Sequence, residues 1–186
     1  TPTQSHTSGF QYFPSITGTS DGGFAVGWYD GGQIRTRSFD ADGNDLGAEL
    51  AVGTGGSEPA VIGLADGDLL TLWQSWTGDG YDVLAARYDD ATATYGSVTV
   101  VNTTTASMQD SASAASTPDG GYVVVWASDG QDGSAYGIYG KRFAADGSAL
   151  GGEFRVNGTV QSDQIRPDVA VAADGDFIVS WRSDAG

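Results

Sequence analysis

The sequence predicts an all-β fold built from tandem four-stranded antiparallel units. A motif in which Trp follows Asp by seven positions recurs four times, and Asp-Gly pairs separate short apolar runs. No stretch sustains the apolar period of a helix, since Gly and Asp interrupt every candidate. An Asp-Gly pair between apolar runs predicts a β-hairpin with a type I′ turn. A recurring unit of about fifty residues has the size of one propeller blade.

The motif divides the chain into three full copies and one half copy, which we treat as one repeat domain. The copies span residues 11–57, 58–109, 110–164 and, for the half copy, 165–186. The motif residues are Asp21 and Trp28, Asp66 and Trp73, Asp119 and Trp126, and Asp174 and Trp181. Because a lone sheet cannot bury both faces, we expect the copies to pack face to face, with the Trp in the core between them.

Four strands are expected in each full copy. The first precedes the motif at residues 14–16, 59–61, 112–114 and 167–169, and the second runs from the Asp-Gly pair to the Trp. The third is expected at 34–39, 83–88 and 138–143, and the fourth at 49–52, 98–101 and 153–156. Three and a half blades do not close a ring. The expected architecture is therefore propeller-like, either incomplete or completed by another chain through self-assembly, and an open stack or β-sandwich is the alternative.

Composition narrows the range of partners. The formal net charge is -16, which argues against nucleic acid, whose phosphates require clustered Lys and Arg. No apolar run approaches the length of a membrane helix, so membrane insertion is not expected. The chain has no Cys and one His, His6, and these counts exclude thiol catalysis and disfavour a catalytic triad or a zinc site.

The acidic, glycine-rich loops that follow the Trp strands are candidate calcium sites. Asp is a hard oxygen ligand of the kind that Ca²⁺ prefers, and Ca²⁺ is the one cofactor that we expect. The candidate ligands are Asp30, Asp79, Asp82, Asp129 and Asp132. The alternative is that these are turn residues on a solvated acidic rim, because Asp caps its own backbone in turns.

Aromatic residues near the expected ends of the blades are candidate glycan contacts. They are Trp76, Tyr29, Tyr81 and Tyr136. Trp76 lies outside the repeated motif, so packing of the repeat does not require a large ring at that position. Exposed rings of this kind predict a glycan or cell-surface partner.

The third copy resembles a known bacterial repeat. The residues that carry the likeness are Asp119–Trp126, Ser128–Ser134, Tyr136–Phe143 and Leu150–Asn157. They are similar to tandem repeats of very long secreted bacterial proteins, which often accompany haemolysin-type (RTX) calcium-binding or cadherin-like modules. The resemblance implies type I export and an extracellular or cell-surface location, and it implies no catalytic residues.

Three functions follow from these observations. The first is a non-catalytic structural or adhesive module of a secreted bacterial surface protein, stabilised by calcium. The alternative is a carbohydrate-binding, lectin-like propeller. The third is a fragment of a polysaccharide-active enzyme, for which paired carboxylates would be required.

Overall fold

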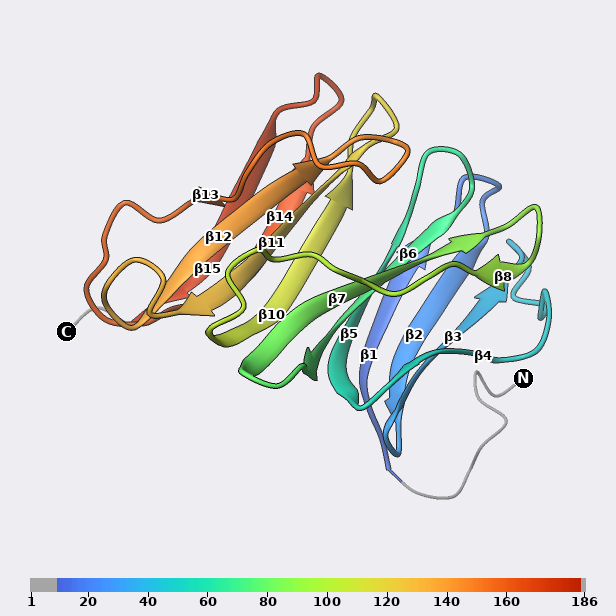
Figure 1. The fold of residues 1–186 in the computed structure, drawn as a ribbon. Coiled ribbons are helices and arrows are strands. Elements are labelled where there is room, and N and C mark those ends of the chain that lie inside the picture. The colour runs from blue at the N-terminus through green and yellow to red at the C-terminus, as the bar shows by residue number, and fades with distance from the viewer. Residues whose placement is uncertain (1–9, 185–186) are drawn as a thin grey trace. The chain divides into compact units, whose positions relative to one another are not determined.

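The computed structural model describes residues 10–184, in which every regular element is a β-strand (Figure 1). Within this part of the chain we find no helix that could cross a membrane. The chain divides into two compact units, which are described separately: unit 1 holds residues 10–73 and 85–99, and unit 2 holds 74–84 and 100–184. The boundary falls inside the second copy, so β6 (Leu69–Trp76) and β7 (Gly80–Asp89) contribute to both units.

Unit 1 contains the first copy and most of the second. Its four-stranded antiparallel sheet has the order β1-β2-β3-β4, with β1 Gln11–Gly18, β2 Phe24–Asp30, β3 Gln33–Phe39 and β4 Leu50–Thr54. The next strand, β5 (Gly56–Gly63), lies beside β1, where Val61 N–H donates to Ser15 Oγ at 3.1 Å. The short strands β8 (Thr94–Tyr95) and β9 (Thr99–Val100) pair with β7. Ala25, Val61 and Leu69 form a buried cluster from both copies.

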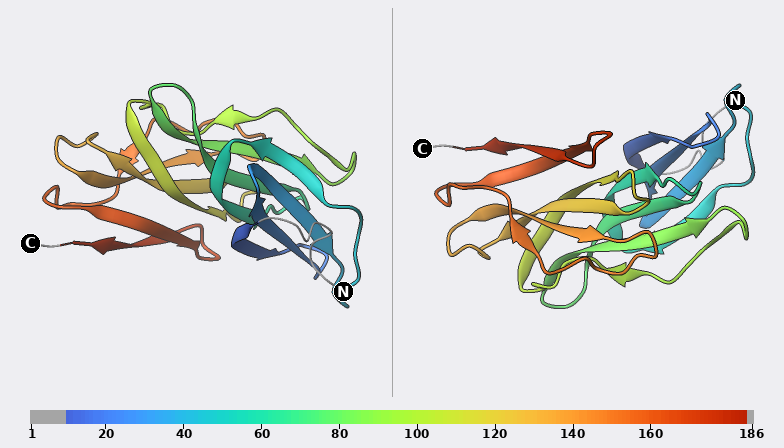
Figure 2. Two further views of the ribbon diagram at one scale, coloured as in Figure 1. Left: turned by 90° about the horizontal axis from the view of Figure 1, so that it is seen from below. Right: turned by 90° about the horizontal axis from the view of Figure 1, so that it is seen from above.

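Unit 2 contains the third copy and the half copy. The third copy forms antiparallel strands in the order β13-β12-β11-β10, with β10 Ser107–Ser116, β11 Tyr122–Asp129, β12 Tyr136–Phe143 and β13 Phe154–Arg155. The half copy is the hairpin β14 (Gln164–Val171) and β15 (Phe177–Ser183), which Figure 2 shows as a separate layer. Val123 and Val125 pack against Val169 across these layers. The predicted face-to-face packing of copies is therefore present within each unit.

The repeated Trp is a core residue in the three full copies, as predicted. Trp28, Trp73 and Trp126 are buried, and Trp126 is 0% exposed. Trp181 of the half copy is 37% exposed, and its indole N–H donates to Gln164 Oε1 at 2.9 Å.

The motif Asp is a turn residue in every copy, but the predicted type I′ turn is wrong. In the first copy, Gly22 N–H donates to Thr19 O at 3.1 Å, and the Thr19 N–H donates to Gly23 O at 3.0 Å. Only the Gly has positive φ, at 87° for Gly22, and the Asp does not. This is a three-residue loop with a type I turn followed by glycine. The Asp instead fixes the loop by accepting a backbone N–H two residues ahead, as Asp21 Oδ1 does from Gly23 at 3.2 Å.

The first strand of each copy is longer than predicted and carries a bulge. Its register shifts in β1, β10 and β14. A non-glycine residue with positive φ occupies the same position of all four copies, fifteen residues before the Trp: Phe13 (54°), Glu58 (52°), Ser111 (53°) and Arg166 (54°). The predicted fourth strand is much shorter in the second and third copies, and β8 was not predicted.

A buried Asn follows the last strand of the second copy and of the third copy, and its side chain accepts a backbone N–H of a neighbouring strand. Asn102 Oδ1 accepts the Val83 N–H at 2.8 Å, and its amide donates to Asp82 Oδ1 at 2.6 Å. Asn157 likewise accepts the Ile138 N–H at 2.7 Å. The side chain of each Asn replaces a strand partner where β9 and β13 stop.

Replacement of Asn102 by Ala should lower the free energy of unfolding by about 1–3 kcal/mol, because the buried Val83 N–H and Asp82 would each lose a partner. Urea unfolding measures the change. Asn44→Ala is the matched control, since Asn44 is exposed and bonded only in its own turn. Equal losses for both variants would refute a structural role for Asn102.

Glu153 joins the end of the second copy to the third. It accepts hydrogen bonds from the Thr103 N–H, from Gln131 Nε2 at 2.7 Å, and from Thr104 Oγ1 at 3.2 Å. Partial burial opposes the charged form, but these hydrogen bonds outweigh it and hold the pKa of Glu153 below its ordinary value of 4.5. The carboxylate therefore stabilises the folded state above pH 4.5, and this contribution is lost as the pH falls through the lowered pKa.

Glu153→Gln should therefore lose stability relative to the unchanged protein at neutral pH, and the difference should shrink well below pH 4.5. Urea unfolding at a series of pH values measures this. A difference that stays constant with pH would contradict the assignment of a lowered pKa.

Candidate functional site

Three of the four predicted ring residues come together in unit 2. Trp76, at the end of β6, is 59% exposed, and its ring meets that of Tyr81 edge to face at 5.6 Å. The start of β7 runs parallel to β10, with Met108 opposite Tyr81. The Tyr136 hydroxyl lies 3.3 Å from the Met108 sulfur. Trp76, Tyr81, Met108 and Tyr136 thus form a row, called here the aromatic strip.

Three carboxylates lie near the Tyr136 end of the strip. Burial, the charges of Asp110 and Asp129, a hydrogen bond to Asp110 and the charge of Asp163 together raise the pKa of Tyr136 to about 12. The Tyr136 N–H also donates to Asp163 Oδ1 at 3.4 Å. The phenol therefore keeps its proton, for which the charged Asp110 is a better acceptor than the Met108 sulfur. Asp110, Asp129 and Asp163 are called the acidic group.

Different parts of the blades supply the acidic group. Asp110 lies in β10, Asp129 ends β11, and Asp163 immediately precedes β14. Asp110 is next to the bulge residue Ser111, whose N–H donates to Gln74 Oε1 at 3.3 Å. Such bulges re-aim side chains at the ends of strands. Glycosidic bond hydrolysis requires a pair of carboxyl groups that flank the bond, and the acidic group supplies the candidates for such a pair in unit 2.

Sequence reasoning named Asp129 as a calcium ligand and missed Met108, Asp110 and Asp163. It placed the first strand of the third copy at 112–114, whereas β10 begins at Ser107. The polar segment before residue 112 was therefore treated as a connection. The strict fifteen-residue spacing from bulge to Trp could have identified it, because it places Asp110 beside the bulge residue of a strand.

Most of the candidate calcium ligands have protein partners. Asp30 pairs with Arg35 Nε at 2.7 Å in unit 1. In unit 2, Asp82 accepts from Asn102, and Asp132 accepts from Asn157 at 3.4 Å. Asp129 belongs to the acidic group, and Asp79 is exposed between β6 and β7. Within residues 10–184 no group of three or more His, Cys, Asp or Glu side chains is arranged to hold a metal ion. Calcium binding remains a prediction.

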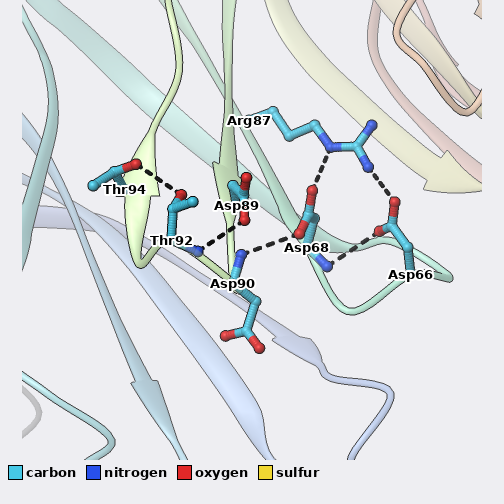
Figure 3. Close-up of polar contacts among 7 residues, drawn as sticks. All are labelled: Asp66, Asp68, Arg87, Asp89, Asp90, Thr92 and Thr94. Carbon is cyan, nitrogen blue, oxygen red and sulfur yellow. Dashed lines mark hydrogen bonds and ion pairs between the residues drawn. The ribbon is translucent and has the colours of Figure 1, made fainter.

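In unit 1, several Asp carboxylates stabilise turns through hydrogen bonds and ion pairs (Figure 3). Arg87 binds Asp68 Oδ2 at 2.6 Å and also pairs with Asp66, both from the second-copy hairpin. Asp68 Oδ1 in turn accepts the Asp90 N–H at 3.1 Å, and Asp89 accepts the Thr92 N–H at 3.0 Å. These carboxylates hold turns in place.

The fourth predicted ring residue, Tyr29, belongs to unit 1. Its ring stacks on Tyr12 at 6.5 Å with an interplanar angle of 17°. Tyr29 therefore belongs to a different group of rings from Trp76, Tyr81 and Tyr136.

No protein-family model matches the sequence, and no curated protein matches it. Solved structures do match. An endo-arabinase from Bacteroides thetaiotaomicron has a TM-score of 0.58 and 16% identity, with 91% of this chain and 68% of that chain covered. A thermostable family-43 glycoside hydrolase has a TM-score of 0.56 and 12% identity, covering 91% and 64%. A xylan β-1,4-xylosidase from Bacillus halodurans has a TM-score of 0.58 and 13% identity, covering 96% and 38%.

The likeness confirms the all-β, propeller-like fold. It contradicts the prediction of a non-catalytic structural or adhesive module, because an endo-arabinase, a family-43 glycoside hydrolase and a xylosidase share the fold. The physical reason for the error is that the repeat and the turn Asp residues belong to the blade scaffold. They are independent of the chemistry at the ends of the strands. This chain spans less than two thirds of two of the three structures.

Proposed function

We propose that this protein acts on a polysaccharide as a glycoside hydrolase, with its site at the aromatic strip and acidic group of unit 2. The observation that carries the proposal is that Tyr136, in the same row of side chains as exposed Trp76, hydrogen-bonds to Asp163 through its N–H and lies near Asp110 and Asp129. The fold shared with an arabinase and a xylosidase supports the same reaction class.

A neutral polysaccharide is the substrate class that this site favours. The protein carries a net charge of -16, and the acidic group adjoins the strip, so anionic chains would be repelled. The edge-to-face rings of Trp76 and Tyr81 offer apolar surface to sugar faces. Arabinan and xylan are the first substrates to test, since the names of the matching enzymes point to them.

Two members of the acidic group have proposed chemical roles. Asp110 and Asp163 are the acid and its partner, one protonating the leaving oxygen while the other acts as base or nucleophile. Tyr136 keeps its proton because of its raised pKa, so it is not the base, and its hydroxyl positions Asp110 by donating to that carboxylate. Asp129 adds negative charge on the Tyr136 side.

Release of reducing ends from a panel of polysaccharides tests the proposal. Neutral arabinan and xylan should be cleaved, and acidic polysaccharides should not. Retention of the protein by a polysaccharide without any release of reducing ends would overturn hydrolysis and leave binding as the activity. Export, type I secretion and a cell-surface location remain further proposals, which the resemblance of the third copy supports.

A further inference from the structure

Unit 1 carries a second aromatic surface, separate from the proposed hydrolytic site. Phe10, Tyr12 and Phe13 are 72%, 49% and 48% exposed. The ring of Tyr12 stacks on Phe10 at 5.6 Å with an interplanar angle of 10°, and on Tyr29 at 6.5 Å and 17°. Phe10, Tyr12, Phe13 and Tyr29 are called the aromatic platform. Three of its rings are nearly parallel, so they present a row of flat faces and edges.

The backbone holds one platform residue in a costly conformation. Phe13 has φ of 54° at the bulge of β1, a left-handed region that a bulky residue rarely adopts. Glu58, at the same position of the neighbouring β5, has φ of 52°. Glycine would satisfy this backbone better, so neither side chain is explained by the turn geometry alone. Ser111 and Arg166 have the same conformation in the other two copies, so the bulge belongs to the repeat and only the ring at residue 13 is particular to the platform.

Asp30, the carboxylate that follows Tyr29, is neutralised by an ion pair. Asp30 pairs with Arg35 at 2.7 Å and accepts from Gln11 Nε2 at 3.1 Å. The platform therefore offers rings with two phenol hydroxyls, from Tyr12 and Tyr29, over a neutral ion pair. A ligand with flat apolar faces, hydroxyl groups and no charge is complementary to it.

We propose that the aromatic platform is a second binding site for a neutral polysaccharide, with sugar faces stacked on Phe10, Tyr12 and Tyr29. Phe13 and Glu58 are the adjoining contacts, an apolar ring and a hydrogen-bond acceptor for sugar hydroxyls. The site holds the polymer without cleaving it, and it does not depend on the proposed hydrolysis, whose residues all lie in unit 2.

Affinity electrophoresis of the full chain in gels with arabinan or xylan tests the platform. All proteins carry Asp110→Asn and Asp163→Asn, so that the polymer stays intact. Tyr12→Ala should weaken retention about tenfold, which corresponds to roughly 1.4 kcal/mol, and Tyr12→Phe should retain most of it. Ile16→Ala is the matched control, since Ile16 is exposed on the same strand but carries no ring.

Each outcome decides the proposal. Equal retention of Tyr12→Ala and Ile16→Ala, or no retention of any protein, would overturn it. A dimer in native mass spectrometry that Tyr12→Ala dissociates would also overturn it, because the platform would then bind a second copy. If the unchanged protein releases no reducing ends but its retention depends on Tyr12, the proposed hydrolysis fails and the platform stands.

Discussion

Trp126→Ala should lower the free energy of unfolding by about 3–5 kcal/mol, the range for deleting a large aromatic side chain from a packed core. Trp126 is 0% exposed, and so is Val124, which lies two residues before it on the same face of β11 in unit 2. The strands on both sides of β11 hold both residues in place. The cavity can therefore close only in part, and the loss should lie toward the upper end of the range.

Trp181→Ala is the matched control, because Trp181 occupies the same motif position in the half copy but is 37% exposed. It should cost clearly less, since little buried surface is lost beyond the hydrogen bond to Gln164. Urea unfolding of both variants measures the difference. A loss for Trp181→Ala as large as that for Trp126→Ala would contradict the assignment of the repeated Trp to the core of full copies alone.

Asp110→Asn should slow polysaccharide hydrolysis by about 10²- to 10⁴-fold, the usual contribution of a positioned acid or base. The change keeps the shape of the side chain and removes its charge. A structural readout accompanies it: one of the negative charges that raise the pKa of Tyr136 disappears, so the pKa should fall below about 12. Ultraviolet titration of tyrosinate formation reports that shift independently of activity.

Asp42→Asn controls for the loss of one negative charge, because Asp42 is an exposed turn residue of unit 1. It should leave the hydrolysis rate unchanged. If Asp110→Asn shifts the pKa of Tyr136 while the rate stays at the unchanged level, the acidic group lies beside the phenol but takes no part in the reaction.

The repeat determined most of what could be predicted about the fold. The seven-residue spacing from Asp to Trp located the first hairpin of each copy and the three buried Trp residues, because turn and core positions depend on local pattern. The Asp bias also has a local cause. Asp66, Asp119 and Asp174 each accept the backbone N–H two residues ahead. Acidity was therefore a weaker sign of calcium than it appeared.

The site was predictable only in part. Trp76, Tyr81 and Tyr136 were predicted as exposed rings near the ends of the blades. Trp76 is exposed, whereas Tyr81 and Tyr136 are half-buried. Their association depends on the parallel contact of β7 with β10, which joins segments far apart in the sequence. Asp110 and Asp163 carry no local signal, because their position near Tyr136 depends on a ring that another strand supplies.

Release of reducing ends from arabinan and xylan, compared between the unchanged protein and Asp110→Asn at equal concentration, is the most direct test of a hydrolytic site in unit 2. We expect sustained release by the unchanged protein and release lowered at least about a hundredfold by the variant. Equal release by both proteins, or none by either, would contradict a hydrolytic role for the acidic group.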